Sequence, residues 1–205
     1  MSDEAMPELR WTDTLSAPRS LATRDDTAVA IIEDPGVIEI ALEARDTYLA
    51  RRAGKIAGVK LPSNPWEVVE KKDLRAVWVG PWRWRLFLPR ERIASLLAAF
   101  REDVETSILS DLTGGFACFR VIGGGAPDIL MRCCPVDLSA VDTHTARGTS
   151  LAGVKCLVLR ETEPANSWLV MAPRSLAEHV ARALTEAART PGRLALFEPA
   201  KPPPV

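Results

Sequence analysis

The fold of this chain is decided by Ala76-Val-Trp-Val-Gly-Pro-Trp-Arg-Trp-Arg-Leu-Phe-Leu-Pro-Arg-Glu-Arg-Ile93, a stretch whose pattern returns later in the sequence. The stretch predicts a strand, a turn at Gly80-Pro81, a second strand and then a helix. The same order returns in Lys155-Cys-Leu-Val-Leu-Arg160 and Ser167-Trp-Leu-Val-Met-Ala-Pro-Arg-Ser-Leu-Ala-Glu178. A pattern that repeats in this way indicates a duplicated structural unit.

Three residues keep their spacing between the two copies. Each pair is separated by 84 residues, and the pairs are Trp84 with Trp168, Pro89 with Pro173, and Arg90 with Arg174. A proline suits the first turn of a helix because the N–H group there has no helical partner to lose. The repeated residues therefore occupy scaffold positions, and we do not expect them to form a catalytic cluster.

Both halves of the chain predict the same series of elements, namely a strand, a helix, further strands and a second helix. The first half begins with an alternating strand over residues 37–42 and a helix over residues 44–52, which Gly54 is expected to end. The second half begins with a strand over residues 116–122 and a helix over residues 128–133. The fold class that we predict is α+β, with helices packed on mainly antiparallel sheets.

The chain is predicted to have one domain between two tails. Residues 31–190 form a single α+β domain of two pseudo-repeated lobes, at about 31–105 and 106–190. Residues 1–30 are polar and lack periodicity, which predicts an extended or disordered arm. Residues 191–205 are rich in proline, whose missing N–H group prevents a helix or a central strand, so we expect a surface tail.

The composition indicates a sizeable core and almost no net charge. Of the 205 residues, 47% are hydrophobic and 26% are charged, and the formal net charge is −1. A dedicated nucleic-acid-binding protein has a basic excess, so that class is excluded. No apolar run is long enough to cross a bilayer and no leader follows Met1, so we expect no membrane partner. The four cysteines are expected to be free and largely buried, in a reducing, cytoplasmic compartment.

A glycine-rich turn, Gly123-Gly-Gly-Ala-Pro127, follows a predicted strand and opens a helix, as a phosphate-binding loop does. It lacks the G-x-G-x-x-G spacing, no Lys, Ser or Thr follows it, and Asp128 would repel a phosphate. We interpret it as a tight turn with Pro127 at the first helical position. We therefore predict that this chain binds no nucleotide or flavin.

The cysteines do not have the spacing of a metal site. Cys133-Cys134 stand far from either histidine along the chain, and no C-x-x-C or H-x-x-x-H pattern occurs. A nucleophilic Cys134, assisted by His144 and by Asp137 or Asp142, would require an activated thiolate and an oxyanion hole. Nothing local supplies either, so we favour a buried structural thiol and assign no catalytic, cofactor-binding or metal-binding residue.

Three tryptophans, Trp78, Trp82 and Trp84, fall in one predicted hairpin. They can be core residues, anchors of a protein interface, or walls of an aromatic cage for a methylated amine. Trp84 favours the core interpretation, because its repeat partner lies in an equivalent strand. Arg83 lies on the strand face opposite Trp84. Trp82 and Arg83 have no obvious counterpart in the repeat and are the better interface candidates.

Several segments resemble the gamma subunit of heterotetrameric sarcosine oxidase and the similar small subunit of N-methylglutamate dehydrogenase. The most specific are Cys134-Pro-Val-Asp-Leu138 and Pro173-Arg-Ser-Leu-Ala-Glu178, and the similarity extends over about residues 61–188. The sequence departs from the family at Trp82-Arg83, where acidic residues are usual. It departs again at its glycine-rich turn, where the family commonly has Ser-Gly-Pro.

The resemblance implies a fold like a truncated folate-binding domain of the aminomethyltransferases. In such complexes the large subunit binds NAD and carries the folate domain, a second subunit carries the flavins FAD and FMN, and a small subunit binds zinc. The complex oxidises an N-methyl amino acid and passes the one-carbon unit to tetrahydrofolate. The resemblance implies a structural role without catalytic residues for this chain. Its possible interface residues are Trp82, Arg83, Cys134, Pro135, Asp137 and Leu138.

Two other functions stay open. A free-standing folate-binding, aminomethyltransferase-like enzyme would require a carboxylate to hold the pterin, and Asp111 and Asp137 are the candidates. A homo-oligomeric interaction module is the other alternative. Glu161 and Glu163 flank a turn and are expected to be surface charges without a catalytic role.

Overall fold

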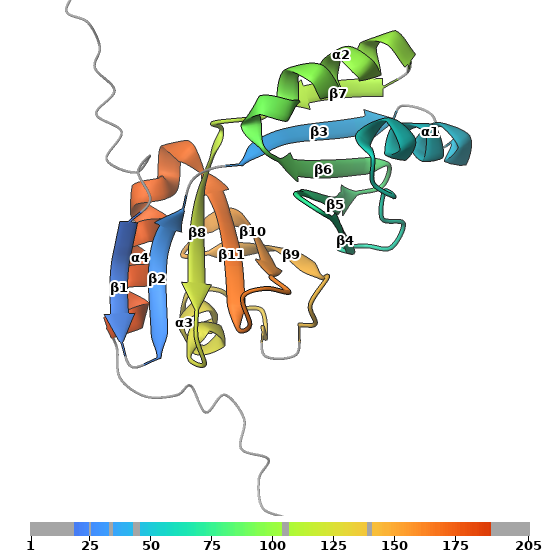
Figure 1. Cartoon of the computed structure of the whole chain (residues 1–205). Helices are drawn as coiled ribbons and strands as arrows, with labels where there is room; N and C mark the ends of the chain where they lie inside the picture. The colour runs from blue at the N-terminus through green and yellow to red at the C-terminus, as the bar shows by residue number, and fades with distance from the viewer. Residues whose placement is uncertain are drawn as a thin grey trace, which may run out of the picture.

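The computed structural model describes residues 19–24, 26–32, 35–42, 46–103, 107–138 and 141–189, which form two antiparallel β-sheets with helices on their outer faces (Figure 1). Among these residues, no helix has the length and hydropathy needed to span a membrane. The mixed architecture confirms the predicted α+β class.

The first lobe is a five-stranded sheet in the order β4-β5-β6-β3-β7, covered by two α-helices. Its strands are β3 (Gly36–Leu42), β4 (Val68–Lys71), β5 (Leu74–Gly80), β6 (Arg83–Leu88) and β7 (Ser107–Asp111). Its helices are α1 (Thr47–Ala57), the short 3-10 helix η1 (Arg90–Arg92) and α2 (Ile93–Asp103).

The second lobe is a six-stranded sheet in the order β1-β2-β8-β11-β10-β9. Its strands are β1 (Arg19–Arg24), β2 (Thr27–Ile32), β8 (Phe116–Ile122), β9 (Ala146–Leu151), β10 (Val154–Arg160) and β11 (Ser167–Pro173). Its helices are α3 (Ala126–Cys133), the 3-10 helix η2 (Arg174–Leu176) and α4 (Ala177–Arg189).

The two lobes match element by element, which confirms the predicted duplication. The series β3, α1, β4, β5, β6, η1, α2 corresponds to β8, α3, β9, β10, β11, η2, α4. The sheet orders β4-β5-β6-β3 and β9-β10-β11-β8 are the same in both lobes. Trp84 and Trp168 are buried in the equivalent strands β6 and β11, as the repeat predicts.

The strands that extend these sheets come from different places in the chain. In the first lobe β7, which follows α2, pairs with β3. In the second lobe the equivalent position beside β8 is taken by β2, from the start of the chain. The first sheet thus continues past residue 105, and the second sheet begins before residue 31. The two lobes are therefore interleaved along the sequence.

The expected arm over residues 1–30 is wrong for its described end, because β1 and most of β2 are paired strands. The physical reason is the alternation of buried Thr27, Val29 and Ile31 with half-buried residues, which places one face of β2 against the core. Residues 1–18 lie outside the described residues. The tail predicted over residues 191–205 also lies outside them.

Three hydrophobic clusters hold the layers together. One lies between the second sheet and α3 and α4, and another between the first sheet and α1 and α2. The third joins the two sheets face to face and includes Val77 and Leu159, which have no exposed surface. Figure 1 shows the strands of the two sheets running at a steep angle to one another.

Helix α1 ends later than the sequence predicts. It begins after Asp46, whose side chain accepts a hydrogen bond from the Tyr48 N–H at 2.7 Å, and it ends at Gly58, where φ is 81°. Gly54, the expected stop, lies inside the helix. A side-chain carbon there would come within 2.8 Å of the Val59 carbonyl oxygen, so the glycine allows the next loop to fold back on the helix. That loop forms one wall of the site described next.

Candidate functional site

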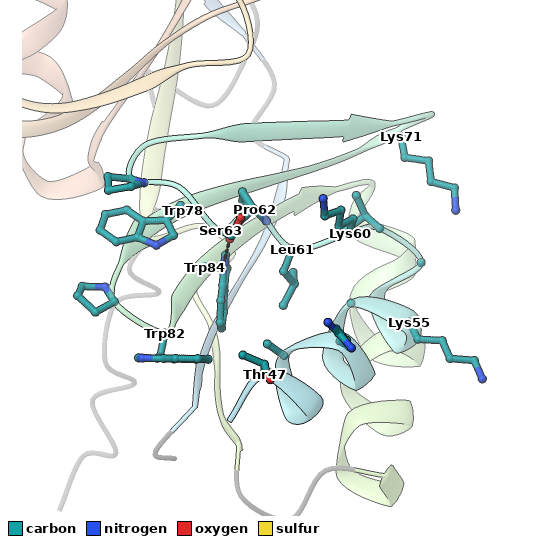
Figure 2. A pocket seen from close by; sticks show the side chains of 17 residues that line it. Thr47, Lys55, Lys60, Leu61, Pro62, Ser63, Lys71, Trp78, Trp82 and Trp84 are labelled. Carbon is teal, nitrogen blue, oxygen red and sulfur yellow. Dashed lines mark hydrogen bonds between the residues drawn. The ribbon is translucent and has the colours of Figure 1, made fainter. Parts of the chain in front are cut away.

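A pocket of about 850 Å³ lies in the first lobe, and we call it the tryptophan pocket. It lies between α1, the loop over residues 58–65, and the strands β4, β5 and β6 with the turn between the last two. Trp78, Trp82 and Trp84 line it together. Figure 2 shows these rings gathered at one end of the pocket, with Lys55, Lys60 and Lys71 toward the other.

Trp84 joins strand β6 to the loop over residues 58–65 at the pocket. Its ring is buried, and its Nε1–H donates a hydrogen bond to the Pro62 carbonyl oxygen at 2.7 Å. The Trp82 ring meets Trp84 edge to face, with centroids 6.4 Å apart and planes at 88°. Trp78 is the cross-strand partner of Trp84. The core interpretation therefore holds for Trp84, while Trp82 is half-buried at the edge of the pocket.

The charged side chains that line the pocket are all positive. Arg51, Lys55, Lys60 and Lys71 line it, all four are exposed, and none of the described lining residues is acidic. The positive potential of such a cluster attracts anions and repels cations. The charge disfavours an aromatic cage for a methylated amine, which was one of the three interpretations of these tryptophans.

Trp82 has an unusual backbone for a bulky residue. Its φ is 58°, in the left-handed region, and Asn166, which directly precedes the corresponding strand β11 of the second lobe, has a φ of 55°. Asparagine adopts this conformation readily, whereas a bulky side chain there costs on the order of 1–2 kcal/mol. The first lobe therefore has a bulky residue in a backbone conformation that asparagine adopts at the corresponding position before β11.

Arg83 does not line the tryptophan pocket. Its guanidinium donates to Glu39 on the neighbouring strand β3 at 2.7 Å, and its side chain is 58% exposed. The same carboxylate accepts a hydrogen bond from Arg85 at 2.9 Å. Trp82 and Arg83, the two interface candidates from the sequence, are thus adjacent in the chain but contact different groups. Trp82 lines the pocket, and Arg83 binds Glu39. Their role as interface residues stays a prediction.

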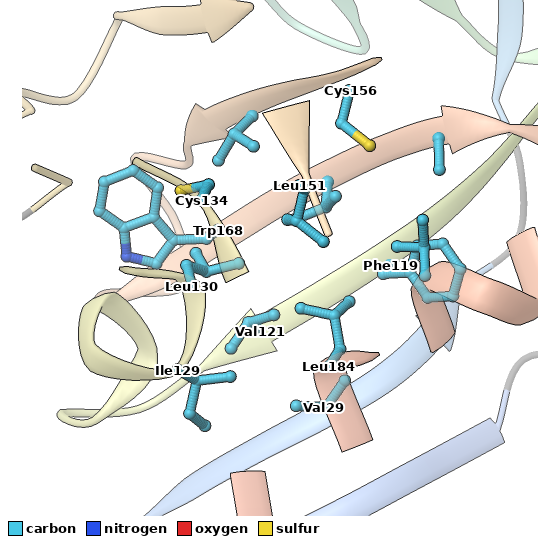
Figure 3. Packing of buried hydrophobic residues seen from close by; sticks show 14 of the residues in the cluster. Val29, Phe119, Val121, Ile129, Leu130, Cys134, Leu151, Cys156, Trp168 and Leu184 are labelled. Carbon is cyan, nitrogen blue, oxygen red and sulfur yellow. The ribbon is translucent and has the colours of Figure 1, made fainter. Parts of the chain in front are cut away.

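The segment Cys134-Pro-Val-Asp-Leu138 closes the core of the second lobe. Figure 3 shows Cys134 beside Trp168 and Leu130, inside the cluster that also buries Leu138 completely. Burial raises the pKa of the Cys134 thiol, which disfavours the thiolate that a nucleophile requires. Pro135 and Asp137 are exposed. The structure does not bring this segment into the cluster around the tryptophan pocket.

The glycine-rich turn after β8 binds the chain's own β1–β2 turn. The Gly124 N–H donates to the Asp26 carboxylate at 3.0 Å, and the Gly125 N–H donates to the Thr27 hydroxyl at 2.9 Å. A side-chain carbon at Gly123 would lie 2.0 Å from the Asp26 carbonyl oxygen. These contacts confirm the interpretation as a structural turn, because both amides that a phosphate would use already have partners.

A second cavity, of about 490 Å³, holds a buried carboxylate. Glu161 is 4% exposed and accepts two hydrogen bonds from Arg120, at 2.9 and 3.1 Å, and one from Ser167 at 2.6 Å. The Arg75 guanidinium from the first lobe lies 3.7 Å from the same carboxylate. The expectation that Glu161 is a surface charge is therefore wrong, because a partner 41 residues earlier in the chain neutralises it. Glu163 is exposed as expected.

The carboxylates nominated for a folate do not line either cavity. Asp111 accepts a hydrogen bond from the Thr113 N–H at 2.9 Å, and the Thr113 hydroxyl accepts one from the Val37 N–H at 3.0 Å. Asp111 thus supports a turn. The tryptophan pocket has no carboxylate among its described residues to hold a pterin, so its residues do not fit that ligand.

Three known proteins are similar to this chain in sequence or in fold. No family model matches the chain. The sarcosine oxidase subunit gamma of Corynebacterium sp. (strain P-1) is 27% identical over 173 residues, which cover 82% of this chain and 78% of that protein. A solved heterotetrameric sarcosine oxidase from Corynebacterium sp. U-96, in complex with pyrrole 2-carboxylate, has a chain that matches with a TM-score of 0.72 and 22% identity. That match covers 82% of this chain and 87% of the other.

The third protein is similar in fold alone. The glycine cleavage system aminomethyltransferase T from Bartonella henselae has a TM-score of 0.58 and 12% identity, over 82% of this chain and 50% of that chain. The resemblance that the motifs indicated is therefore confirmed: this chain is similar to the gamma subunit of heterotetrameric sarcosine oxidase, and its fold is similar to that of aminomethyltransferase T.

Proposed function

We propose that this chain is a structural, gamma-type subunit of a sarcosine oxidase-like complex, and that it has no catalytic residue of its own. The observation that carries the proposal is the length of the match to a sarcosine oxidase gamma subunit, which covers 82% of this chain and 78% of that protein. The match therefore extends over most of both proteins. The shared fold with a chain of a heterotetrameric sarcosine oxidase supports the same assignment.

The proposed complex oxidatively demethylates an N-methyl amino acid and transfers the one-carbon unit to tetrahydrofolate. Its FAD, FMN, NAD, zinc and tetrahydrofolate would be bound by the large, flavin-bearing and small zinc-binding subunits. This chain would contribute contact area to those partners. We place the complex in the cytoplasm, where the four free cysteines would stay reduced.

The chemistry of the described side chains supports a structural role. Burial raises the pKa of Cys118 to about 12 and the pKa values of Cys133 and Cys156 to about 11, so these thiols are poor nucleophiles. The carboxylate of Glu161 is bound by Arg120, and that of Asp26 is bound by the glycine-rich turn. These groups stabilise the fold, and the described residues that line the tryptophan pocket include no acid.

The experiment is affinity purification of the tagged full-length chain from cells that express it with its partner subunits. The expected product is a yellow complex whose flavin absorbance is bleached by sarcosine or another N-methyl amino acid under anaerobic conditions. Purification of this chain alone, from cells in which the other subunits are shown to be present, would overturn the proposal.

A titration of tetrahydrofolate into the purified chain separates this proposal from the folate-binding alternative. We expect no saturable change in tryptophan fluorescence, since neither Asp111 nor Asp137 lines either of the two cavities described above. Saturable binding together with one-carbon transfer by the isolated chain would instead support a free-standing aminomethyltransferase-like protein.

A further inference from the structure

We infer that the tryptophan pocket binds an acidic segment of a partner subunit. One apolar side chain of that segment would pack against Trp82, and its carboxylates would lie beside Lys55, Lys60 and Lys71. The inference rests on the proposed function, which supplies the partner, and it adds the chemistry by which the partner is recognised.

The first argument is charge complementarity. The chain as a whole has a net charge of −1, yet the described lining of this pocket carries Arg51, Lys55, Lys60 and Lys71 and no acid. Four positive side chains therefore line this pocket without an acidic side chain among its described lining residues. Exposed charges of this kind steer a partner of opposite sign and set its orientation.

The second argument is the position of the positive groups. Lys55 lies on α1, Lys60 on the following loop and Lys71 at the end of β4, so the three lysines come from three separate elements (Figure 2). An extended segment with several carboxylates can place one beside each lysine, and the pocket volume of about 850 Å³ accommodates more than one side chain.

The third argument is the residue at the β5–β6 turn. The connection before β11 in the second lobe is longer, but its last residue, Asn166, suits the left-handed backbone that Trp82 adopts directly before β6 in the first lobe. A tryptophan at a position that favours asparagine points to a function for its ring outside the turn itself. Tryptophan is among the residues that most often anchor protein interfaces.

The first test uses carbodiimide cross-linking of the assembled complex, which couples a lysine to a carboxylate only where the two touch. Mass spectrometry should find Lys55, Lys60 or Lys71 joined to an acidic segment of another subunit. Lys155, which is exposed on β10 of the second lobe, is the internal control and should give no link to that segment.

The second test compares two tryptophan variants. Trp82→Asn should leave the isolated chain folded, because asparagine suits the left-handed backbone and so offsets part of the lost contact with Trp84, and should weaken binding to the partner about tenfold or more. Trp84→Phe removes the hydrogen bond to Pro62 and should lower the melting temperature. A double variant, Lys60→Glu with Lys71→Glu, should also weaken the complex, while Lys155→Glu should not.

The outcomes separate this inference from the proposed function. If the complex forms but the cross-links lie elsewhere and Trp82→Asn binds as the unaltered chain does, the inference is overturned and the proposed function stands. If no complex forms with the unaltered chain, both are overturned. If the unaltered chain binds tetrahydrofolate saturably, and Trp82→Asn loses that binding while the complex stays intact, the inference is also overturned. The pocket would then bind a small ligand and not an acidic segment.

Discussion

Arg120 on β8 donates two hydrogen bonds, at 2.9 and 3.1 Å, to the carboxylate of Glu161, which is only 4% exposed. The Ser167 hydroxyl donates a third hydrogen bond to the same group. Arg75, from the other lobe, lies 3.7 Å away. This carboxylate is therefore a point of polar contact between the two sheets.

Replacement of this carboxylate should destabilise the fold. Glu161→Gln keeps the shape but removes the charge that compensates Arg120, and we expect a loss of about 2 kcal/mol in the free energy of unfolding. Urea denaturation of the isolated chain measures it. Glu163→Gln, at an exposed position two residues away, is the matched control and should change the free energy by less than about 0.5 kcal/mol.

The glycine-rich turn should tolerate no side chain at Gly123. Its φ is 118°, and an added carbon would lie 2.0 Å from the Asp26 carbonyl oxygen, so Gly123→Ala has to displace the β1–β2 turn. Gly114→Ala is the control, because φ there is 80° but the space is open. We expect Gly123→Ala to cost at least about 2 kcal/mol more than Gly114→Ala. Equal melting temperatures for the two variants would contradict this account of the turn.

The hydrogen bonds to Asp26 give the fold a pH dependence. The Gly124 amide and the Thr27 hydroxyl hold the pKa of the Asp26 carboxyl below its usual value of 3.8. Because the folded state favours the charged form, the stabilisation is present above pH 3.8 and is lost as the pH falls through the lower folded pKa. The difference in unfolding free energy between the unaltered chain and Asp26→Asn should be constant from pH 5 to 7 and shrink below pH 4. A difference independent of pH would be inconsistent with the contact.

The four thiols should be slow to react in the folded chain. Burial raises the pKa of Cys118 to about 12 and that of Cys156 to about 11, so almost no thiolate exists at pH 8. Iodoacetamide should label all four cysteines quickly in urea and none at a comparable rate without it. Since the folded state favours the neutral thiols, their contribution to stability should fall as the pH rises above 9. One fast-reacting cysteine in the native chain would indicate an activated thiolate.

The sequence predicted the parts of the fold that depend on local pattern and on repetition. The duplicated hairpin and helix, with Trp84 and Trp168 buried at equivalent positions, could be found because the spacing of 84 residues is visible in the sequence. The place of β2 beside β8 could not, since a strand's choice of neighbour is decided by tertiary packing. The end of α1 was missed because Gly54 serves a close approach by the loop rather than a stop.

The candidate site was only partly predictable. The sequence indicated that Trp82 differs from Trp84, because no tryptophan stands 84 residues after Trp82. It could not show that Lys55 and Lys71, from separate elements, share a pocket with it. The burial of Glu161 was also hidden, because its partner Arg120 becomes a neighbour only when β8 and β11 pair. The signal that was available for Trp82 is the asparagine 84 residues later, at position 166.

Native mass spectrometry of the purified assembly tests the central claim most directly, because it reports which chains are present and which of them carry cofactors. We predict an assembly that contains this chain together with flavin-bearing and NAD-binding subunits. On partial dissociation, this chain should be released at its bare mass of 22.4 kDa. Release of this chain with a bound flavin, nucleotide, zinc ion or folate at full occupancy would contradict the claim that it is a structural subunit.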